Sequence, residues 1–345
     1  MDNEFILLPE RLLPWFREHH RDLPWRQDRQ PYHVWLSEIM LQQTRVEAVR
    51  GYYARFLEAL PTVQALAAAS PELCQKLWEG LGYYTRVRNL QKAAREITEQ
   101  YGGEFPRDYE AVRGLSGIGD YTAGAICSIC FEQPTAAVDG NVLRVASRLT
   151  AEARPVSDPA YRRELTASLS AVYPAGHCGD FTQALMELGA TVCVPNGEPR
   201  CGECPLRDLC RAREAGTQMQ YPVRAAKKPR RAEEKTVFLL RCGDRIALRK
   251  RPRTGLLAGL WEYPNVPGTL TVEAALEQAE TWQTHPTAPE TAVEKTHIFT
   301  HVEWKMRCYT IQCAAMPPEF AWPTLAELTA RYALPTAFRM FTPEF

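Results

Sequence analysis

The 345-residue chain is predicted to fold as a mainly α-helical N-terminal part followed by a small α+β domain. Up to about Arg213, apolar residues recur at three- and four-residue spacing, which is typical of amphipathic helices. Leu73, Leu77 and Leu81 are one example. Beyond residue 235 the pattern changes to short alternating runs, which indicate strands. The change in periodicity predicts two domains, and the length accommodates them.

A basic segment separates the two parts. Between Arg211 and Lys235 it contains eight basic and three acidic residues, two prolines and little apolar content. After it, we expect strands over 236–240 and 245–249 around a Cys-Gly-Asp turn, a helix over 271–278, and a half-buried strand over 304–311. The expected organisation is a first domain over 1–212, a basic linker over 213–235 and a second domain over 236–345.

The bulk composition excludes several classes of protein. The 41 basic and 41 acidic side chains cancel, so any nucleic-acid surface has to be a local patch. No apolar run approaches the roughly 20 residues of a membrane helix, and the first four residues lack the basic start of a signal peptide. Eleven cysteines, an odd number, argue against a disulfide framework. We therefore expect a soluble intracellular protein.

Four cysteines form a dense cluster with the spacing C-x7-C-x2-C-x5-C: Cys193, Cys201, Cys204 and Cys210. Four buried free thiols are one interpretation, but they are improbable at this density. Zinc also binds four cysteines, usually as two separated C-x2-C pairs. A single tight run is closer to iron-sulfur spacing, so we favour one 4Fe-4S cluster.

A glycine turn lies between two helical patterns, in Leu115-Ser-Gly-Ile-Gly119. Gly117 and Gly119 permit positive φ and let backbone amides approach a ligand, and the following helix N-terminus favours an anion. The segment is therefore a candidate phosphate-binding turn. A plain helix stop is the alternative.

Two carboxylates are candidates for chemistry. Glu38 lies among Leu36, Ile39 and Met40 in a helix expected from Tyr32, and burial there would raise its pKa toward that of a general acid. The alternative places Glu38 on the wet face of that helix.

The second carboxylate, Asp139, precedes a helical pattern together with Asn141. Either residue would serve as an N-cap, which is a purely structural role. A carboxylate at a rigid helix entry is also well placed to act electrostatically.

Taken together, these segments resemble the MutY family of adenine DNA glycosylases. The matching segments are Trp35–Glu38 with Leu41–Thr44, Gly80–Tyr84, Gly117–Gly119, Val138–Asn141 and the four cysteines, in the family's order. The similarity covers essentially the whole chain and is strongest over 22–210. It implies a helix-hairpin-helix glycosylase fold, with a helical barrel over about 31–135, a cluster-bearing helical domain from 1–30 with 136–212, and a Nudix-like C-terminal domain.

The resemblance implies removal of adenine mispaired with 8-oxoguanine or guanine in double-stranded DNA, after the base is flipped from the stack. Glu38 matches the acid that protonates adenine at N7, and Asp139 matches the carboxylate that stabilises the oxocarbenium sugar. Tyr121 and Asn141 match residues that support the intermediate and position water or Asp139. We expect a cytoplasmic, nucleoid-associated monomer.

Tyr121 also bears on the reaction's outcome. Bifunctional enzymes similar to endonuclease III carry a lysine at this place, which forms a Schiff base and nicks the strand. A phenol replaces that amine here. The sequence therefore predicts base removal without efficient strand cleavage.

Further residues match positions that find and hold the lesion. Gln43 and Tyr83 match side chains that wedge into the duplex. Thr44 and Leu81 match contacts to the lesion. Trp25, Arg26 and Gln183 match the lining of the adenine pocket. Phe299, Thr300 and His301 match the lesion-reading loop.

Three departures from the family pattern stand out. Thr300 replaces the usual serine, which keeps the hydroxyl but restricts χ1, so we expect an effect on lesion preference. Seven residues instead of six separate Cys193 from Cys201, which suggests a loop insertion. The C-terminal domain has no glutamate-rich Nudix signature, which argues against pyrophosphate hydrolysis.

Two other functions are possible alternatives to a monofunctional adenine glycosylase. A bifunctional glycosylase and lyase acting on oxidised pyrimidines is disfavoured by Tyr121 and by the presence of residues 236–345. The second alternative is a non-enzymatic, DNA-binding redox sensor that uses the cluster. It is disfavoured because it assigns no function to Glu38 and Asp139.

Overall fold

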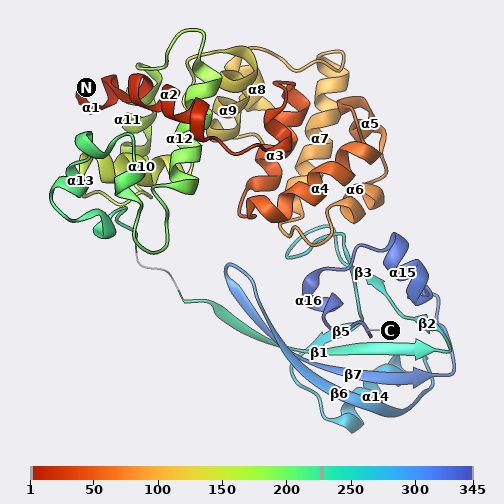
Figure 1. The fold of residues 1–345 in the computed structure, drawn as a ribbon. Coiled ribbons are helices and arrows are strands. Elements are labelled where there is room, and N and C mark those ends of the chain that lie inside the picture. Colours follow the sequence, from red (N-terminus) through yellow and green to blue (C-terminus); the bar gives the residue numbers. More distant parts are fainter. Residues whose placement is uncertain (1–2, 226–228, 344–345) are drawn as a thin grey trace. The chain divides into compact units, whose positions relative to one another are not determined.

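The computed structural model describes residues 3–225 and 229–343, so Lys227 and Lys228 of the predicted basic linker lie outside the described residues. The chain forms two compact units, Met1–Ala68 with Asn89–Ala226, and Ala69–Arg88 with Lys227–Phe345. The first unit is helical and the second contains the sheet (Figure 1). The predicted fold class, helices followed by a small α+β domain, is confirmed.

Helices of very different length build the first unit. They are α1 (Asn3–Ile6), α2 (Leu8–His19), α3 (Pro31–Leu41), α4 (Val46–Ala59), α5 (Val63–Ala68), α8 (Tyr109–Gly114), α9 (Asp120–Phe131), α10 (Gly140–Thr150), α11 (Pro159–Ser170), α12 (Cys178–Thr191) and α13 (Arg211–Glu214). Helix α6 (Pro71–Leu77) belongs to the second unit, and α7 (Thr85–Gln100) begins there and continues into the first. Among the residues described, no helix is long and apolar enough to cross a membrane.

Side-chain caps fix where several helices begin. Asp108, Asp139 and Asp158 each accept a hydrogen bond from a backbone N–H in the first turn of α8, α10 and α11. Such a cap satisfies one of the helix's unpaired amides and contributes about 1 kcal/mol. The entries of α8, α10 and α11 are therefore set by local sequence.

Two apolar clusters of the first unit pack the helices around the candidate site. The larger joins α2, α10, α11 and α12 through side chains such as Leu12, Leu143 and Phe181. The smaller lies between α3 and α9. Gly124 on α9 lets this helix approach the chain before α10 closely, because a Cβ there would lie 2.5 Å from the carbonyl oxygen of Ala136.

The second unit is a mixed sheet with helices on its faces. Its strands are β1 (Arg231–Cys242), β2 (Arg245–Ile246), β5 (Asn265–Pro267), β6 (Pro286–Ile298) and β7 (Val302–Cys313), in the order β2-β1-β7-β6, with β5 paired to β1. Strands β1 and β7 run parallel, and β6 and β7 form an antiparallel hairpin. A separate pair joins β3 (Arg249–Lys250) and β4 (Trp261–Glu262).

Successive side chains of β1 point to opposite faces of the sheet and pack into two different apolar cores. Val237 and Leu239 pack on one side with α15 (Leu325–Arg331) and α16 (Thr336–Arg339), while Phe238 and Leu240 pack on the other with α14 (Val272–Thr281). The predicted strands over 236–240 and 304–311 lie in β1 and β7, and the predicted helix over 271–278 lies in α14. The run 245–249 is split between β2 and β3. Strand β6 was not predicted, because its prolines and polar residues do not alternate.

The close approach at Gly124 generates a stability prediction. Gly124→Ala forces a methyl group against the backbone at Ala136, and overpacking of this kind costs about 1–3 kcal/mol. We expect the midpoint of thermal unfolding, followed by circular dichroism, to fall by several degrees.

Gly114→Ala is the matched control. Gly114 is also helical, and a Cβ there would meet nothing within 4 Å. Alanine there should leave the midpoint unchanged or raise it slightly. Equal midpoints for the two variants would contradict the assigned role of Gly124.

Candidate active site and cysteine cavity

Helix α3 places Glu38 inside the first unit. Pro31 occupies the first turn of this helix, and eight of its residues are buried. Glu38 is 7% exposed, so it does not lie on a wet face. Burial raises the pKa of Glu38 to about 7, against the lowering effect of a hydrogen bond from Tyr121. At neutral pH this carboxyl group is therefore partly protonated.

Tyr121 reaches Glu38 from the first turn of α9. Its hydroxyl donates a hydrogen bond to Oε2 of Glu38. Burial, and then the negative charge of Glu38, raise the pKa of Tyr121 well above its usual value. Tyr121 is thus a neutral donor that favours the ionised form of Glu38.

Asp139 is both an N-cap and part of the same site. Its Oδ1 accepts the N–H of Val142 at 2.7 Å, and its Oδ2 accepts the side-chain amide of Asn141 at 2.7 Å. Burial raises the pKa of Asp139, and these two donors oppose that effect. The structural role weighed from sequence is real and does not exclude the chemical one.

One cavity of about 790 Å³ in the first unit brings together nine of the predicted site residues. Lining it are residues predicted for acid catalysis, for the adenine pocket and for the duplex wedge: Trp25, Arg26, Glu38, Gln43, Thr44, Tyr121, Asp139, Asn141 and Gln183. Gln43 has a φ of 60°, in the left-handed region that non-glycine residues seldom occupy. The backbone after α3 is therefore strained where the predicted wedge residue lies.

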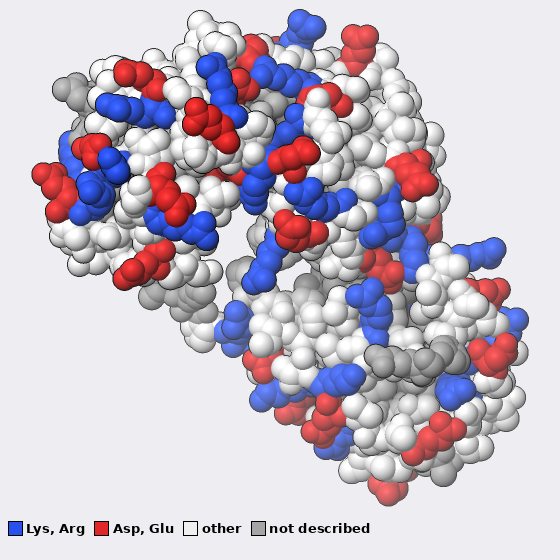
Figure 2. Space-filling view, in the orientation of Figure 1, with Lys and Arg blue, Asp and Glu red and all other residues white. Residues whose placement is uncertain are grey.

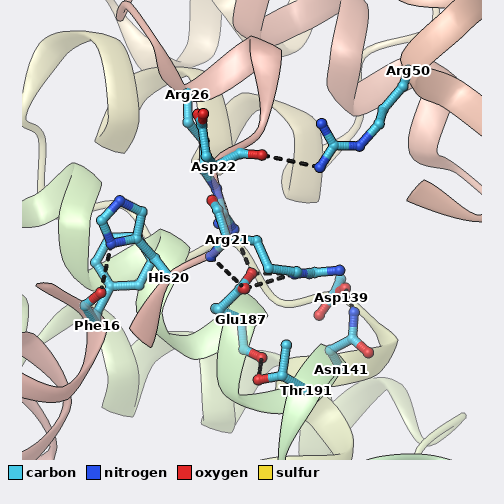
Figure 3. A network of polar contacts seen from close by, with 10 residues as sticks. All are labelled: Phe16, His20, Arg21, Asp22, Arg26, Arg50, Asp139, Asn141, Glu187 and Thr191. Carbon is cyan, nitrogen blue, oxygen red and sulfur yellow. Dashed lines mark hydrogen bonds and ion pairs between the residues drawn. The ribbon is translucent and has the colours of Figure 1, made fainter. Parts of the chain in front are cut away.

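Glu187 on α12 is a lining residue that sequence reasoning missed. It is fully buried and accepts hydrogen bonds from Nε and Nη2 of Arg21 at 2.7 and 2.9 Å and from Nη2 of Arg26 at 2.7 Å (Figure 3). Burial alone would raise the pKa of Glu187, but the Arg21 hydrogen bonds and the Arg26 charge outweigh it and lower the pKa to about 2. This carboxylate stays ionised and orients Arg26 in the cavity wall.

The glycine turn takes the predicted conformation at one of its two glycines. Gly117 has a φ of 78°, and a Cβ there would lie 2.6 Å from Cβ of Asn89. Gly119 is the N-cap of α9 in extended conformation, without positive φ. The turn leads directly into the helix that carries Tyr121.

The predicted lesion-reading residues outside this cavity lie in the second unit. Tyr83 has a φ of 46°, and its hydroxyl lies 2.9 Å from the Thr300 hydroxyl. Phe299 packs edge-on against Trp304, and the carbonyl of His301 accepts the N–H of Arg231. Leu81 is buried. Tyr83 and Thr300, predicted separately, are therefore direct partners.

The four clustered cysteines line a second cavity of the first unit, together with apolar side chains of α10 and α12. Arg148 donates to the sulfur of Cys193 at 3.2 Å. The four cysteine side chains therefore face one shared space, and one of their sulfurs has a cationic donor. Four cysteine sulfurs are the donor set of either a zinc site or an iron-sulfur cluster.

The two sites are connected by Arg144 on α10. It donates to Oδ1 of Asn141 at 2.9 Å and to the carbonyl of Cys193 at 2.7 Å. Asn141 in turn holds Asp139. Acidic and basic side chains intermingle over the visible face of each unit (Figure 2).

Comparison with known proteins defines the class of this fold and site. The HhH-GPD superfamily base excision DNA repair protein family matches residues 36–169, and the NUDIX domain matches residues 236–342. The solved structure of a thermostable thymine-DNA glycosylase is 28% identical with a TM-score of 0.57, covering 62% of this chain and 98% of its own. An endonuclease III in a non-covalent DNA complex is 26% identical with a TM-score of 0.52, covering 61% and 95%. The chain is a DNA glycosylase of the HhH-GPD superfamily.

Curated relatives narrow the class. Adenine DNA glycosylase of Rattus norvegicus is 36% identical over 96% of this chain and 77% of its own length, and that of Homo sapiens is 36% identical over 96% and 73%. The enzyme of Buchnera aphidicola subsp. Baizongia pistaciae is 34% identical over 75% and 74%. The chain belongs to the adenine DNA glycosylase family, whose members hydrolyse N-glycosyl bonds in base excision repair.

Proposed function

We propose that this enzyme removes adenine mispaired with 8-oxoguanine or guanine in duplex DNA and leaves an abasic site. The observation that carries the proposal is the pairing of Glu38, with its pKa near 7, and Asp139 in one cavity. The cavity is large enough for an extruded base.

Glu38 acts as the general acid in this proposal. A carboxyl group with a pKa near 7 is partly protonated at working pH and is poised to donate to N7 of adenine. Protonation turns the base into a neutral leaving group. Tyr121 holds the carboxyl group in place before the transfer and stabilises the carboxylate that remains afterwards.

Asp139 acts on the sugar. The two hydrogen bonds from Val142 and Asn141 favour its ionised form, and a fixed negative charge stabilises the oxocarbenium ion that develops as the base leaves. Tyr121 offers a neutral phenol where a lyase needs an amine, so no Schiff base forms and the strand is not nicked. This disfavours the bifunctional alternative.

We further propose that the four clustered cysteines hold one 4Fe-4S cluster. The cysteine cavity supports this, and the bonds from Arg144 and Arg148 would fix the loop that carries Cys193. When bound, such a cluster supplies a rigid crosslink between α12 and the chain before α13.

Loss of the acid tests the main proposal. Glu38→Gln removes the proton donor but keeps the shape, so single-turnover release of adenine opposite 8-oxoguanine should fall about 10²–10⁴-fold while duplex binding persists. Glu47→Gln, at a highly exposed position on α4, is the control and should retain activity.

The same assay resolves substrate and outcome. Adenine opposite 8-oxoguanine and guanine should be released, adenine opposite thymine should not, and strand breaks should appear only after alkali. Adenine release by Glu38→Gln at the wild-type rate would falsify the acid assignment. Efficient borohydride trapping of a covalent adduct between an amine of the enzyme and the DNA would overturn the monofunctional assignment.

The Tyr121–Glu38 hydrogen bond predicts a shift in pH dependence. This bond lowers the pKa of Glu38, so Tyr121→Phe should raise that pKa and move the alkaline fall in single-turnover rate, near pH 7 in the wild type, upward by about one to two pH units. Tyr161→Phe is the control, because Tyr161 bonds Ser147 and does not line the cavity. An unmoved or downward-shifted profile in Tyr121→Phe contradicts this prediction.

Metal analysis tests the cluster proposal. Anaerobically purified protein should contain about four iron and four sulfide per chain. Cys204→Ser should lose much of that iron, whereas Cys242→Ser, in β1, should not. A content of about one zinc ion per chain without iron would contradict the cluster proposal and indicate a zinc site.

A further inference from the structure

Two arginines at the catalytic cavity have no role in the proposed chemistry. Arg162 on α11 and Arg224, in the segment after α13, both line the cavity that holds Glu38 and Asp139. Both are exposed to solvent. Arg224 belongs to the segment that leads from the first unit to the second, so a residue of the predicted linker contributes to the wall of the catalytic site.

The backbone of Val156 contacts both the Arg162 side chain and the residue that precedes Arg224. Nε of Arg162 donates to the carbonyl of Val156 at 2.7 Å, and the N–H of Val156 donates to the carbonyl of Val223 at 3.0 Å. The first bond leaves the terminal nitrogens of the Arg162 guanidinium without a hydrogen-bond partner among residues 3–225 and 229–343. The second places Arg224 one residue beyond an anchored backbone group.

Helix α10 anchors the same segment a second time. Nε of Arg148 donates to the carbonyls of Gln218 and Tyr221, at 2.9 and 3.2 Å. Residues 218–223 are therefore bound to the catalytic unit through three backbone carbonyls, and they do not form a free tether. The Arg224 side chain accordingly starts from a fixed position.

The charges around the cavity favour an anion near these arginines. Five arginines and three carboxyl groups line it. Arg21 and Arg26 both donate hydrogen bonds to Glu187. Arg144 donates to the Asn141 side chain and to the carbonyls of Gly189 and Cys193. Arg162 and Arg224 remain: within the described parts of the chain, no ion pair to either is found.

Arg162 and Arg224 line one cavity as two cationic groups, and a bound anion would offset the repulsion between them. Solvated surface charge is the plain alternative, but Arg163, the neighbour of Arg162, illustrates that case because it does not line the cavity.

We propose that Arg162 and Arg224 bind the backbone phosphates that flank the extruded adenosine. The inference rests on the proposed function. A nucleotide whose base enters the cavity stays joined to a phosphate on each side of its sugar, so those phosphates come to the cavity's mouth. A guanidinium matches phosphate geometry with two parallel donors. Both arginines act as positioning residues that hold the sugar near Asp139.

Binding measurements test this without catalysis. In a Glu38→Gln background, Arg162→Ala and Arg224→Ala should each weaken binding of an adenine:8-oxoguanine duplex about tenfold and lower the salt slope by about one. Arg163→Ala and Arg230→Ala are the matched controls, from the same helix and the same basic segment, and should change affinity much less. Thermal unfolding midpoints check that each variant is folded.

Neutral DNA supplies the specific test. Methylphosphonate in place of the phosphates on either side of the adenosine removes the proposed charge. Protein with both arginines should lose about tenfold in affinity per contacted phosphate, and the variant that lacks the matching arginine should lose little more. An equal penalty in all variants, or equal affinities for Arg224→Ala and Arg230→Ala, overturns the proposal.

Different measurements would contradict adenine removal and phosphate binding by Arg162 and Arg224. If the enzyme with Glu38 intact releases no adenine, the proposed function fails, while the phosphate contacts are still measured by binding to the same duplexes. If adenine is released and the arginine variants behave as their controls, the proposed function stands and the phosphate site is wrong.

Discussion

Two carboxyl groups lie buried in one cavity, and the surroundings of each decide what charge it carries. Burial disfavours the ionised form of both, and each raises the other's pKa if both are charged. Among the residues that the structure describes, Glu38 accepts from the Tyr121 hydroxyl alone, whereas Asp139 accepts from the helix N–H of Val142 and from the Asn141 amide. In the proposed reaction, this asymmetry in donors is what lets Glu38 keep a proton while Asp139 keeps a charge.

Glu187 shows why sequence could identify part of this site and not the rest. Glu38 and Glu187 each lie in an apolar helical run, Leu-Ser-Glu-Ile-Met and Leu-Met-Glu-Leu-Gly. Yet the pKa of Glu38 is raised to about 7 and that of Glu187 is lowered to about 2. The difference comes from Arg21 and Arg26, more than 160 residues away along the chain. Local pattern indicates that a carboxylate is buried, but only tertiary packing supplies its partners.

The same limit explains which elements were predicted. Strand β7 and helix α14 have the periodicity of half-buried elements and were found at nearly their observed positions. Strand β6 has no such pattern, because its pairing with β7 decides its conformation. Among the site residues, the capping aspartate could be anticipated locally. The roles of Arg162 and Arg224 could not, because they depend on a backbone contact between Val156 and Val223.

Helix α10 joins these separate features into one rigid element. Asp139 caps its N-terminus, and Arg144 and Arg148 lie one turn apart on one face of it. Arg144 connects the capping region to the carbonyl of Cys193, and Arg148 connects the Cys193 sulfur to the segment that ends at Arg224. A displacement of the cysteine loop would therefore act on Asp139 and on Arg224 through the same helix. The cysteine cavity, remote in sequence from Glu38, thereby supports the catalytic geometry of the proposed reaction.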